Sequence, residues 1–147
     1  MSDSIKVLFI CVHNAARSRM AEAFLRVRGG DRFEVTSSGY EPREVNPLVL
    51  EAMSNIGVQL ASTGPQPSVF ELFKQGRLFN YVISVCDAEH DQKCPIFAGV
   101  TQRLSWSFPD PSTFEGSHEA KLARVAEVRD AIGARVDAWI KTVTKDA

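Results

Sequence analysis

Residues 5–18 read IKVLFICVHNAARS, and this stretch decides the fold. Its first half, Ile5–Cys11, is apolar except for Lys6, which predicts a parallel strand that is buried on both faces. A short loop follows, and apolar residues at helical spacing begin near Ser18, where we expect a helix to start. A strand, a loop and a helix in this order place the loop at the carboxyl edge of a sheet, where open α/β sheets bind ligands.

The rest of the chain continues this alternation. We predict further strands at 33–38, 81–85 and 102–106, and helices at 18–28, 47–56, 69–75 and 117–144. The methionine and aromatic side chains of the helices are expected in the core, as is the face of the first helix that carries Met20, Phe24 and Val27. The order predicts an α/β fold with a four-stranded parallel sheet and helices on both faces. No repeat or linker interrupts it, so residues 1–147 are expected to form one domain.

Composition argues against several classes of function. The formal net charge is -1, and no stretch approaches the roughly 20 apolar residues that span a bilayer, so neither nucleic acid nor a membrane is an expected partner. The apolar run at 7–12 is too short for a signal peptide, and we expect a cytoplasmic protein. In a reducing compartment, Cys11, Cys86 and Cys94 are expected to be reactive or metal-binding thiols rather than a disulfide scaffold.

The loop after the first strand has the features of an oxyanion site with a nucleophile. A loop that leads into a helix N-terminus directs several N–H groups and the helix dipole at one point. Arg17 can grip two oxygens of an anion, and the same field favours the thiolate of Cys11 as the nucleophile. Ser18 can donate a hydrogen bond to that thiolate, and Asn14 tolerates a left-handed conformation. We expect the anion to be bound by Val12, His13, Asn14, Ala15, Ala16, Arg17 and Ser18.

The chain resembles the low-molecular-weight protein tyrosine phosphatase family, and most closely its arsenate reductase branch. The resemblance runs nearly end to end, over residues 7–22, 37–39, 45–47, 57–58, 82–86, 94–95 and the step Asp110-Pro111. It implies a flavodoxin-like, low-molecular-weight phosphatase fold, which agrees with the pattern of strands and helices. It also implies that Cys11 attacks the substrate and that Asp110 takes part in catalysis.

Two activities fit this resemblance. In a phosphatase, Cys11 would take the phosphoryl group of an aryl phosphate and Asp110 would protonate the leaving phenol. In an arsenate reductase, Cys86 would attack Cys11 to release arsenite, and Cys94 would then form a disulfide with Cys86. The resemblance to thioredoxin-coupled arsenate reductases includes all three cysteines. It therefore implies thioredoxin as the reductant and no bound cofactor.

Departures from the phosphatase pattern favour the reductase. His13 stands where these phosphatases usually have Gly, and Arg19 stands where they usually have Pro. The aromatic pair that often follows Asp-Pro, and that helps to hold a phenol ring, is replaced by Ser112-Thr113. The loop at 64–67 lacks an acidic residue that some members use in a cation site, so the resemblance does not imply a dependence on potassium.

The residues leave further alternatives open. Cys86, His90 and Cys94 have a spacing that could hold a metal on one face of a helix, although the usual Cys-x2-Cys spacing is absent. The later thiols could also simply pack, and the loop could bind an oxyanion without turnover. A regular helix would separate the Cα atoms of residues 86 and 94 by about 12 Å, whereas a disulfide needs about 7 Å or less. We therefore expect the polar segment 87–93 to be mobile and to change shape on oxidation.

Overall fold

The computed structural model describes residues 4–60, 64–85 and 102–144. Its strands are β1 (Ile5–Cys11), β2 (Phe33–Gly39), β3 (Tyr81–Ser84) and β4 (Gln102–Ser105). Its helices are α1 (Arg17–Gly29), α2 (Pro47–Ser54), α3 (Val69–Lys74) and α4 (His118–Thr144), with short 3-10 turns η1 (Gly30–Arg32) and η3 (Pro111–Thr113). Every predicted strand and helix is present, and each end lies within two residues of its expected position.

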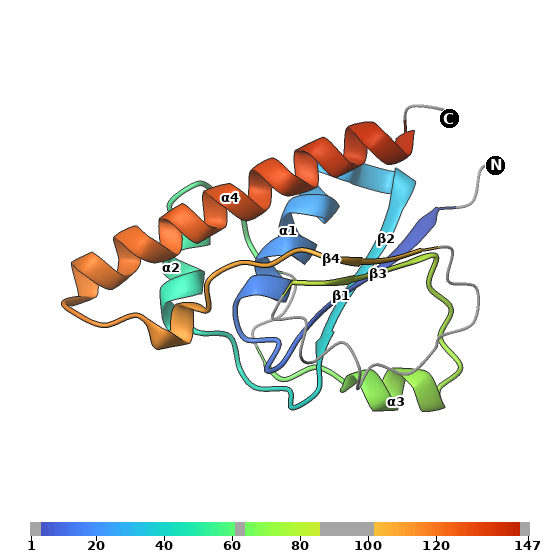
Figure 1. Ribbon diagram of the computed structural model, residues 1–147, viewed down its shortest axis with the longest axis horizontal. Helices are drawn as coiled ribbons and strands as arrows, with labels where there is room; N and C mark the ends of the chain where they lie inside the picture. Colours follow the sequence, from blue (N-terminus) through green and yellow to red (C-terminus); the bar gives the residue numbers. More distant parts are fainter. Residues whose placement is uncertain (1–3, 61–63, 86–101, 145–147) are drawn as a thin grey trace.

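The four strands form one parallel sheet in the order β2-β1-β3-β4. Figure 1 shows α1, α2 and α4 on one face of this sheet and α3 on the other. α4 is the longest helix and packs against both α1 and α2. The predicted fold class, a parallel sheet with helices on both faces, is confirmed.

β1 is central because its side chains are apolar in both directions. Val7, Phe9 and Cys11 point into the larger core beneath α1 and α4, whereas Leu8 and Ile10 join the smaller core under α3. Successive side chains of a strand alternate between its faces, so an unbroken apolar run fits only a strand that is covered on both sides. This explains why the first strand, which the sequence predicts to be buried on both faces, lies inside the sheet with a neighbour on each side.

Two expectations about burial are wrong in part. Val27 is 59% exposed, because the buried stretch of α1 runs from Arg17 to Leu25 and its last turn extends beyond that stretch. Phe70 and Phe73 of α3 are 42% and 47% exposed. α3 is only 6 residues long and buries just Val69 and Leu72 against the sheet, so its aromatic side chains lie on its outer side.

β2 and β3 lie on opposite sides of β1, so the order of the strands reverses at β1, which ends at Cys11. The helix after β1, α1, and the helix before β3, α3, cover opposite faces of the sheet. In α/β sheets such a point opens a crevice at the carboxyl ends of the strands. Ile10 pairs with Ser84, and the backbone N–H of Val85 donates to the Ile10 carbonyl oxygen at 2.9 Å. Within the described residues, no helix is long and apolar enough to cross a membrane.

Candidate active site

Cys11 is the last residue of β1 and is 3% exposed. Its Sγ lies 3.0 Å from Ser18 Oγ and accepts the backbone N–H of Asn14 at 3.2 Å. Asn14 adopts the expected left-handed conformation, with φ 53°, and its Nδ2 donates to Ser18 Oγ at 2.7 Å. Two polar groups thus contact the sulfur, and one of them is a backbone N–H donor.

Each backbone carbonyl oxygen of the loop at 12–16 accepts a hydrogen bond. The carbonyl oxygens of Val12, His13 and Ala15 accept the backbone N–H groups of Glu41, Arg43 and Asn46 at 2.8–2.9 Å. The Asn14 carbonyl oxygen accepts Nε of Arg19 at 2.6 Å. In a trans peptide the N–H points opposite to the C=O. The N–H groups of these peptides therefore point away from the donors that bind their carbonyl oxygens. Such a loop presents donors, not acceptors, to an anion at the start of α1.

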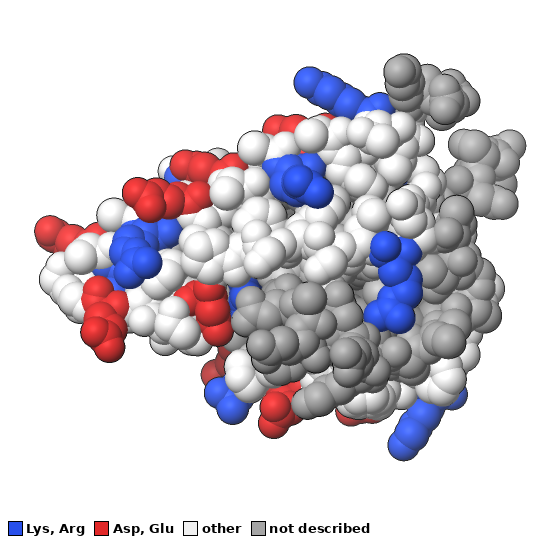
Figure 2. All heavy atoms as spheres, in the orientation of Figure 1, with Lys and Arg blue, Asp and Glu red and all other residues white. Residues whose placement is uncertain are grey.

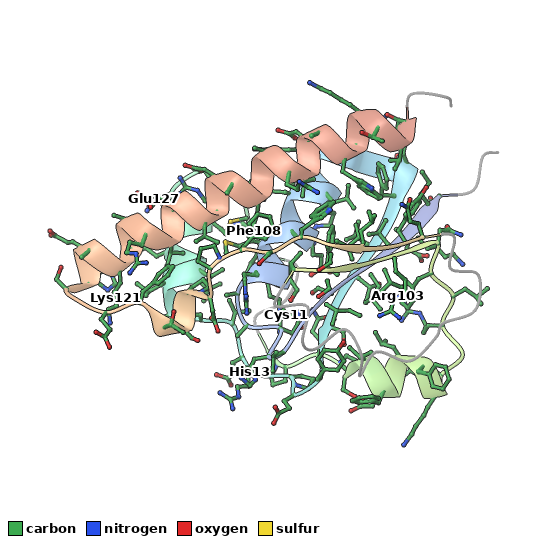
Figure 3. All side chains as sticks on the ribbon, viewed as in Figure 1. Cys11, His13, Arg103, Phe108, Lys121 and Glu127 are labelled. Atoms are coloured by element: carbon green, nitrogen blue, oxygen red, sulfur yellow. The ribbon has the colours of Figure 1, made fainter. Side chains whose placement is uncertain are left out.

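Arg17 links the loop to the segment between β4 and α4. Its side chain is 8% exposed, and its Nη1 donates to the carbonyl oxygen of Phe108 at 3.1 Å. Its Nη2 lies 3.6 Å from Oδ2 of Asp110, whose side chain is 39% exposed. In Figure 3, Cys11 and Phe108 lie toward the end of the sheet where the strands finish, away from Arg103 near the start of β4.

Asp110 is held in its own turn as well as by Arg17. Its Oδ1 accepts the backbone N–H of Ser112 at 2.9 Å and the Ser112 hydroxyl at 2.8 Å. Burial would raise the pKa of Asp110, but the bonds from Ser112 and the positive charge of Arg17 outweigh it and hold that pKa below its ordinary value. Asp110 is therefore ionised at neutral pH in the free protein.

A small cavity of about 40 Å³ lies at Cys11. The described residues that line it are Cys11, His13, Ala15, Ala16, Arg17, Asn46, Asp110 and Ser112. Asn14 and Ser18 lie beneath it at the Cys11 sulfur, whereas Val12 packs against the hydrophobic core. His13 is fixed at the rim, where its Nδ1 lies 3.3 Å from the carbonyl oxygen of Glu41.

Asn46 and Ser112 are site residues that sequence reasoning missed. Asn46 caps α2 through a bond from the Leu48 N–H to its side chain, and its own N–H holds the Ala15 carbonyl oxygen. An Asn before Pro at a helix start is a capping signal, but nothing in that signal points to the loop at 11–18.

Part of the predicted site lies outside the described residues. This applies to Cys86, Cys94, the alternative metal ligand His90 and the segment 87–93, and it leaves those predictions as they stand. Among the described ranges, no group of three or more His, Cys, Asp or Glu side chains could hold a metal ion.

The surface charge of the described residues that Figure 2 draws forms no basic patch that would attract an anion. Figure 2 shows acidic and basic side chains interspersed on the face that is drawn, in keeping with the net charge of -1. Any attraction for an anion at this site would therefore be local.

Comparisons with known proteins agree with this geometry. The family described as low molecular weight phosphotyrosine protein phosphatase matches residues 6–147. An arsenate reductase of Halalkalibacterium halodurans is 34% identical over 136 residues, which cover 92% of this chain and 95% of that protein. The solved thioredoxin-dependent arsenate reductase of Corynebacterium glutamicum is 31% identical with a TM-score of 0.73, over 99% of this chain but only 65% of that longer one.

A tyrosine phosphatase of Erwinia amylovora shares the fold at 16% identity, with a TM-score of 0.73 over 96% of this chain and 94% of its own. Reductases and a phosphatase thus have the same architecture, and the family match extends from Lys6 to the last residue. The chain belongs to the low molecular weight phosphotyrosine protein phosphatase family.

Proposed function

We propose that this protein is an arsenate reductase with Cys11 as its nucleophile. The observation that carries the proposal is the cavity of about 40 Å³ at Cys11, to whose lining the described residues contribute no phenyl or indole ring. A bare tetrahedral oxyanion fits a cavity of this size beside Arg17, whereas a phenol ring needs more room and is usually held by aromatic side chains. The activity named for the Halalkalibacterium relative, at 34% identity over most of both chains, supports the same choice.

In the first step, the Cys11 thiolate attacks arsenic(V) and forms a sulfur–arsenic bond. The displaced hydroxide takes a proton and leaves as water. The remaining oxygens carry the negative charge, and the loop N–H groups and Arg17 are positioned to bind it. Because these donors are already oriented in the free protein, little reorganisation is needed when the anion binds.

A second thiol completes the reduction. We assign this step to Cys86, which attacks the Cys11 sulfur and forms a Cys11–Cys86 disulfide. The electron pair of the sulfur–arsenic bond passes to arsenic, which leaves as arsenite. The bond from the Val85 N–H to the Ile10 carbonyl supports this assignment, because these two residues directly precede the two cysteines.

Regeneration requires an external thiol reductant. Cys94 would attack Cys86 and free Cys11, and a dithiol protein would then reduce the Cys86–Cys94 disulfide. We propose thioredoxin for this role, because the similar Corynebacterium enzyme is thioredoxin-dependent. We propose the cytoplasm as the compartment, since it keeps such thiols reduced.

Aryl phosphate hydrolysis is the second candidate, and the position of Asp110 at the cavity favours it. A phosphatase needs this carboxyl group to be protonated when the phenol leaves. Since Ser112 and Arg17 hold its pKa below the ordinary value, Asp110 is a poor proton donor at neutral pH. We therefore expect phosphatase activity to be slow beside arsenate reduction.

The decisive experiment measures arsenite formed from arsenate with thioredoxin, thioredoxin reductase and NADPH. We expect many turnovers for the wild type, about one arsenite per enzyme for Cys94→Ser, and none for Cys11→Ser. No arsenite from the wild type, together with rapid hydrolysis of para-nitrophenyl phosphate, would instead identify a phosphatase.

A further inference from the structure

Arg19 bonds to the loop at 11–18 from the buried side, away from the cavity. It lies in the first turn of α1 and is 1% exposed. Its Nε donates to the carbonyl oxygen of Asn14 at 2.6 Å, and its Nη2 donates to the carbonyl oxygens of Gly64 and Arg43. One guanidinium group thus ties the loop to the segments that follow β2 and α2.

A buried carboxylate balances this charge. Glu22 is 9% exposed, and its Oε1 accepts the Ser37 hydroxyl at 2.8 Å. Burial raises the pKa of Glu22, although the Ser37 bond and the nearby Arg26 and Arg19 oppose that shift. Burial lowers the pKa of Arg19, while the negative charges of Glu22 and the Cys11 thiolate oppose that shift. Arg19 lies close enough to Cys11 for its charge to interact with that of the thiolate.

Arg19 differs from the other groups that hold the loop. The carbonyl oxygens of Val12, His13 and Ala15 accept backbone N–H groups, which every residue except proline supplies. In the described part of the chain, the Asn14 carbonyl oxygen accepts a side-chain donor instead. This bond therefore depends on which residue occupies position 19.

The direction of this bond matters for the site. Arg19 draws the Asn14 carbonyl oxygen inward, away from the cavity. The same peptide carries the N–H of Ala15, and in a trans peptide this N–H points the opposite way. Ala15 is one of the residues that line the cavity at Cys11.

We propose that Arg19 is a positioning residue whose Nε–H bond to the Asn14 carbonyl aligns the Ala15 N–H with the bound oxyanion. Unlike Arg17, Arg19 does not line the cavity and does not touch the substrate. The inference rests on the proposed function only in requiring that the loop binds an oxyanion. It holds whether or not that anion is afterwards reduced.

The test compares three residues at position 19 by the binding of inorganic phosphate. Binding is read from the protection of Cys11 against iodoacetamide, in a Cys86→Ser/Cys94→Ser background that leaves one thiol to react. Arg19→Gln keeps a donor nitrogen at the position of Nε, whereas Arg19→Met removes it at similar length. We expect phosphate affinity within about threefold of the parent for Gln and about tenfold or more weaker for Met, as the loss of one oriented donor requires.

Two further variants make the test specific. Arg129→Met removes a comparable bond, from Arg129 Nη1 to the Ala52 carbonyl oxygen at 2.8 Å, between α4 and α2, and should leave phosphate affinity unchanged. If Arg19→Met does not fold, the double variant Arg19→Met/Glu22→Gln takes its place. It removes both charges, so Glu22 is not left as a buried carboxylate without Arg19. A merely structural Arg19 would lower the melting temperature without weakening phosphate binding.

The proposal would be overturned if Arg19→Met/Glu22→Gln bound phosphate as tightly as the parent. It would also be overturned if Arg19→Gln lost as much phosphate affinity as the Met variants. If Arg129→Met lost as much phosphate affinity as Arg19→Met, the proposal would be overturned too, because the effect would then not be specific to the loop. Phosphate binding transfers no electrons, so a failure to form arsenite leaves the result of this experiment unaffected.

Discussion

At the residue scale, the site depends on a few atoms that surround the Cys11 sulfur. Asn14 adopts a left-handed conformation, which costs an ordinary residue about 1–2 kcal/mol. Its N–H, side-chain amide and carbonyl groups are bonded to Cys11, Ser18 and Arg19 respectively. These bonds offset the cost and keep the loop in the shape that an anion needs.

Ser18→Ala should slow the reaction of Cys11 more than it destabilises the fold. A hydrogen bond to a charged group is worth about 1.5–3 kcal/mol, so losing Ser18 Oγ at 3.0 Å should slow alkylation at pH 7 by about tenfold or more. The rate with iodoacetamide is measured in the background where Cys86 and Cys94 are Ser. Ser117→Ala, which removes a cap from α4, is the control and should leave this rate unchanged.

Asp110→Asn should change the pH dependence of stability. A carboxyl group whose pKa is lowered by folding stabilises the protein above its unfolded pKa, and this contribution is lost as pH falls through the folded pKa. The side chain is 39% exposed, so we expect a loss below about 1 kcal/mol at pH 7. The difference from wild type should shrink as pH falls below the ordinary pKa of 3.8 and vanish only below the lower pKa of the folded state. Urea unfolding at pH 7 and pH 3 measures it, and an equal difference at both pH values would contradict this assignment.

At the scale of elements, the end of β2 shapes the loop after β1. Gly39 pairs with Cys11 in the parallel register. A Cβ atom there would lie 2.7 Å from the Val12 carbonyl oxygen and 2.9 Å from the Asn14 N. The close approach of two backbones, rather than an unusual φ, is therefore what requires glycine at this position.

Gly39→Ala should displace the loop and weaken anion binding. Overpacking against fixed backbone costs about 1–3 kcal/mol, and we expect both the free energy of unfolding and phosphate affinity to fall. Urea unfolding and phosphate protection of Cys11 measure the two effects. Gly64→Ala is the matched control, since a Cβ atom there meets nothing within 4 Å. If Gly39→Ala kept both the free energy of unfolding and the phosphate affinity of the parent, the loop would be shown to adjust freely to the added Cβ atom.

At the scale of the whole molecule, aromatic rings join the sheet to α4. The ring of Trp139 lies 5.7 Å from Phe33, 5.1 Å from Tyr81 and 6.1 Å from Trp106, and Trp106 in turn lies 5.9 Å from Phe9. This cluster connects the longest helix to three strands and to the segment after β4, which leads on to Asp110. The position of Asp110 thus depends on the packing of α4.

Trp139→Ala should lower the free energy of unfolding by about 3–5 kcal/mol, because it removes a large side chain that is only 8% exposed. Val27→Ala, at a position that is 59% exposed, should change it by less than about 0.5 kcal/mol. Urea unfolding monitored by circular dichroism measures both. A loss below about 1 kcal/mol for Trp139→Ala would mean that α4 does not depend on this cluster.

The sequence by itself determined the secondary structure, the parallel sheet and the loop that carries Cys11, Arg17 and Ser18. These follow from local patterns, because apolar periodicity distinguishes strands from helices and a loop between strand and helix must lie at the carboxyl edge. The left-handed Asn14 could also be predicted, since few residue types tolerate that conformation.

Only the tertiary structure decided which distant groups complete the site. Arg17 and Phe108 are 91 residues apart in the chain, and the bond between them depends on how β4 and α4 pack. Sequence patterns gave no role to Arg19 and Asn46, because a charged residue in a helix and a helix cap are both ordinary on a surface. Their roles come from the carbonyl groups of a folded loop, whose directions are fixed only once β1, β2 and α2 have come together.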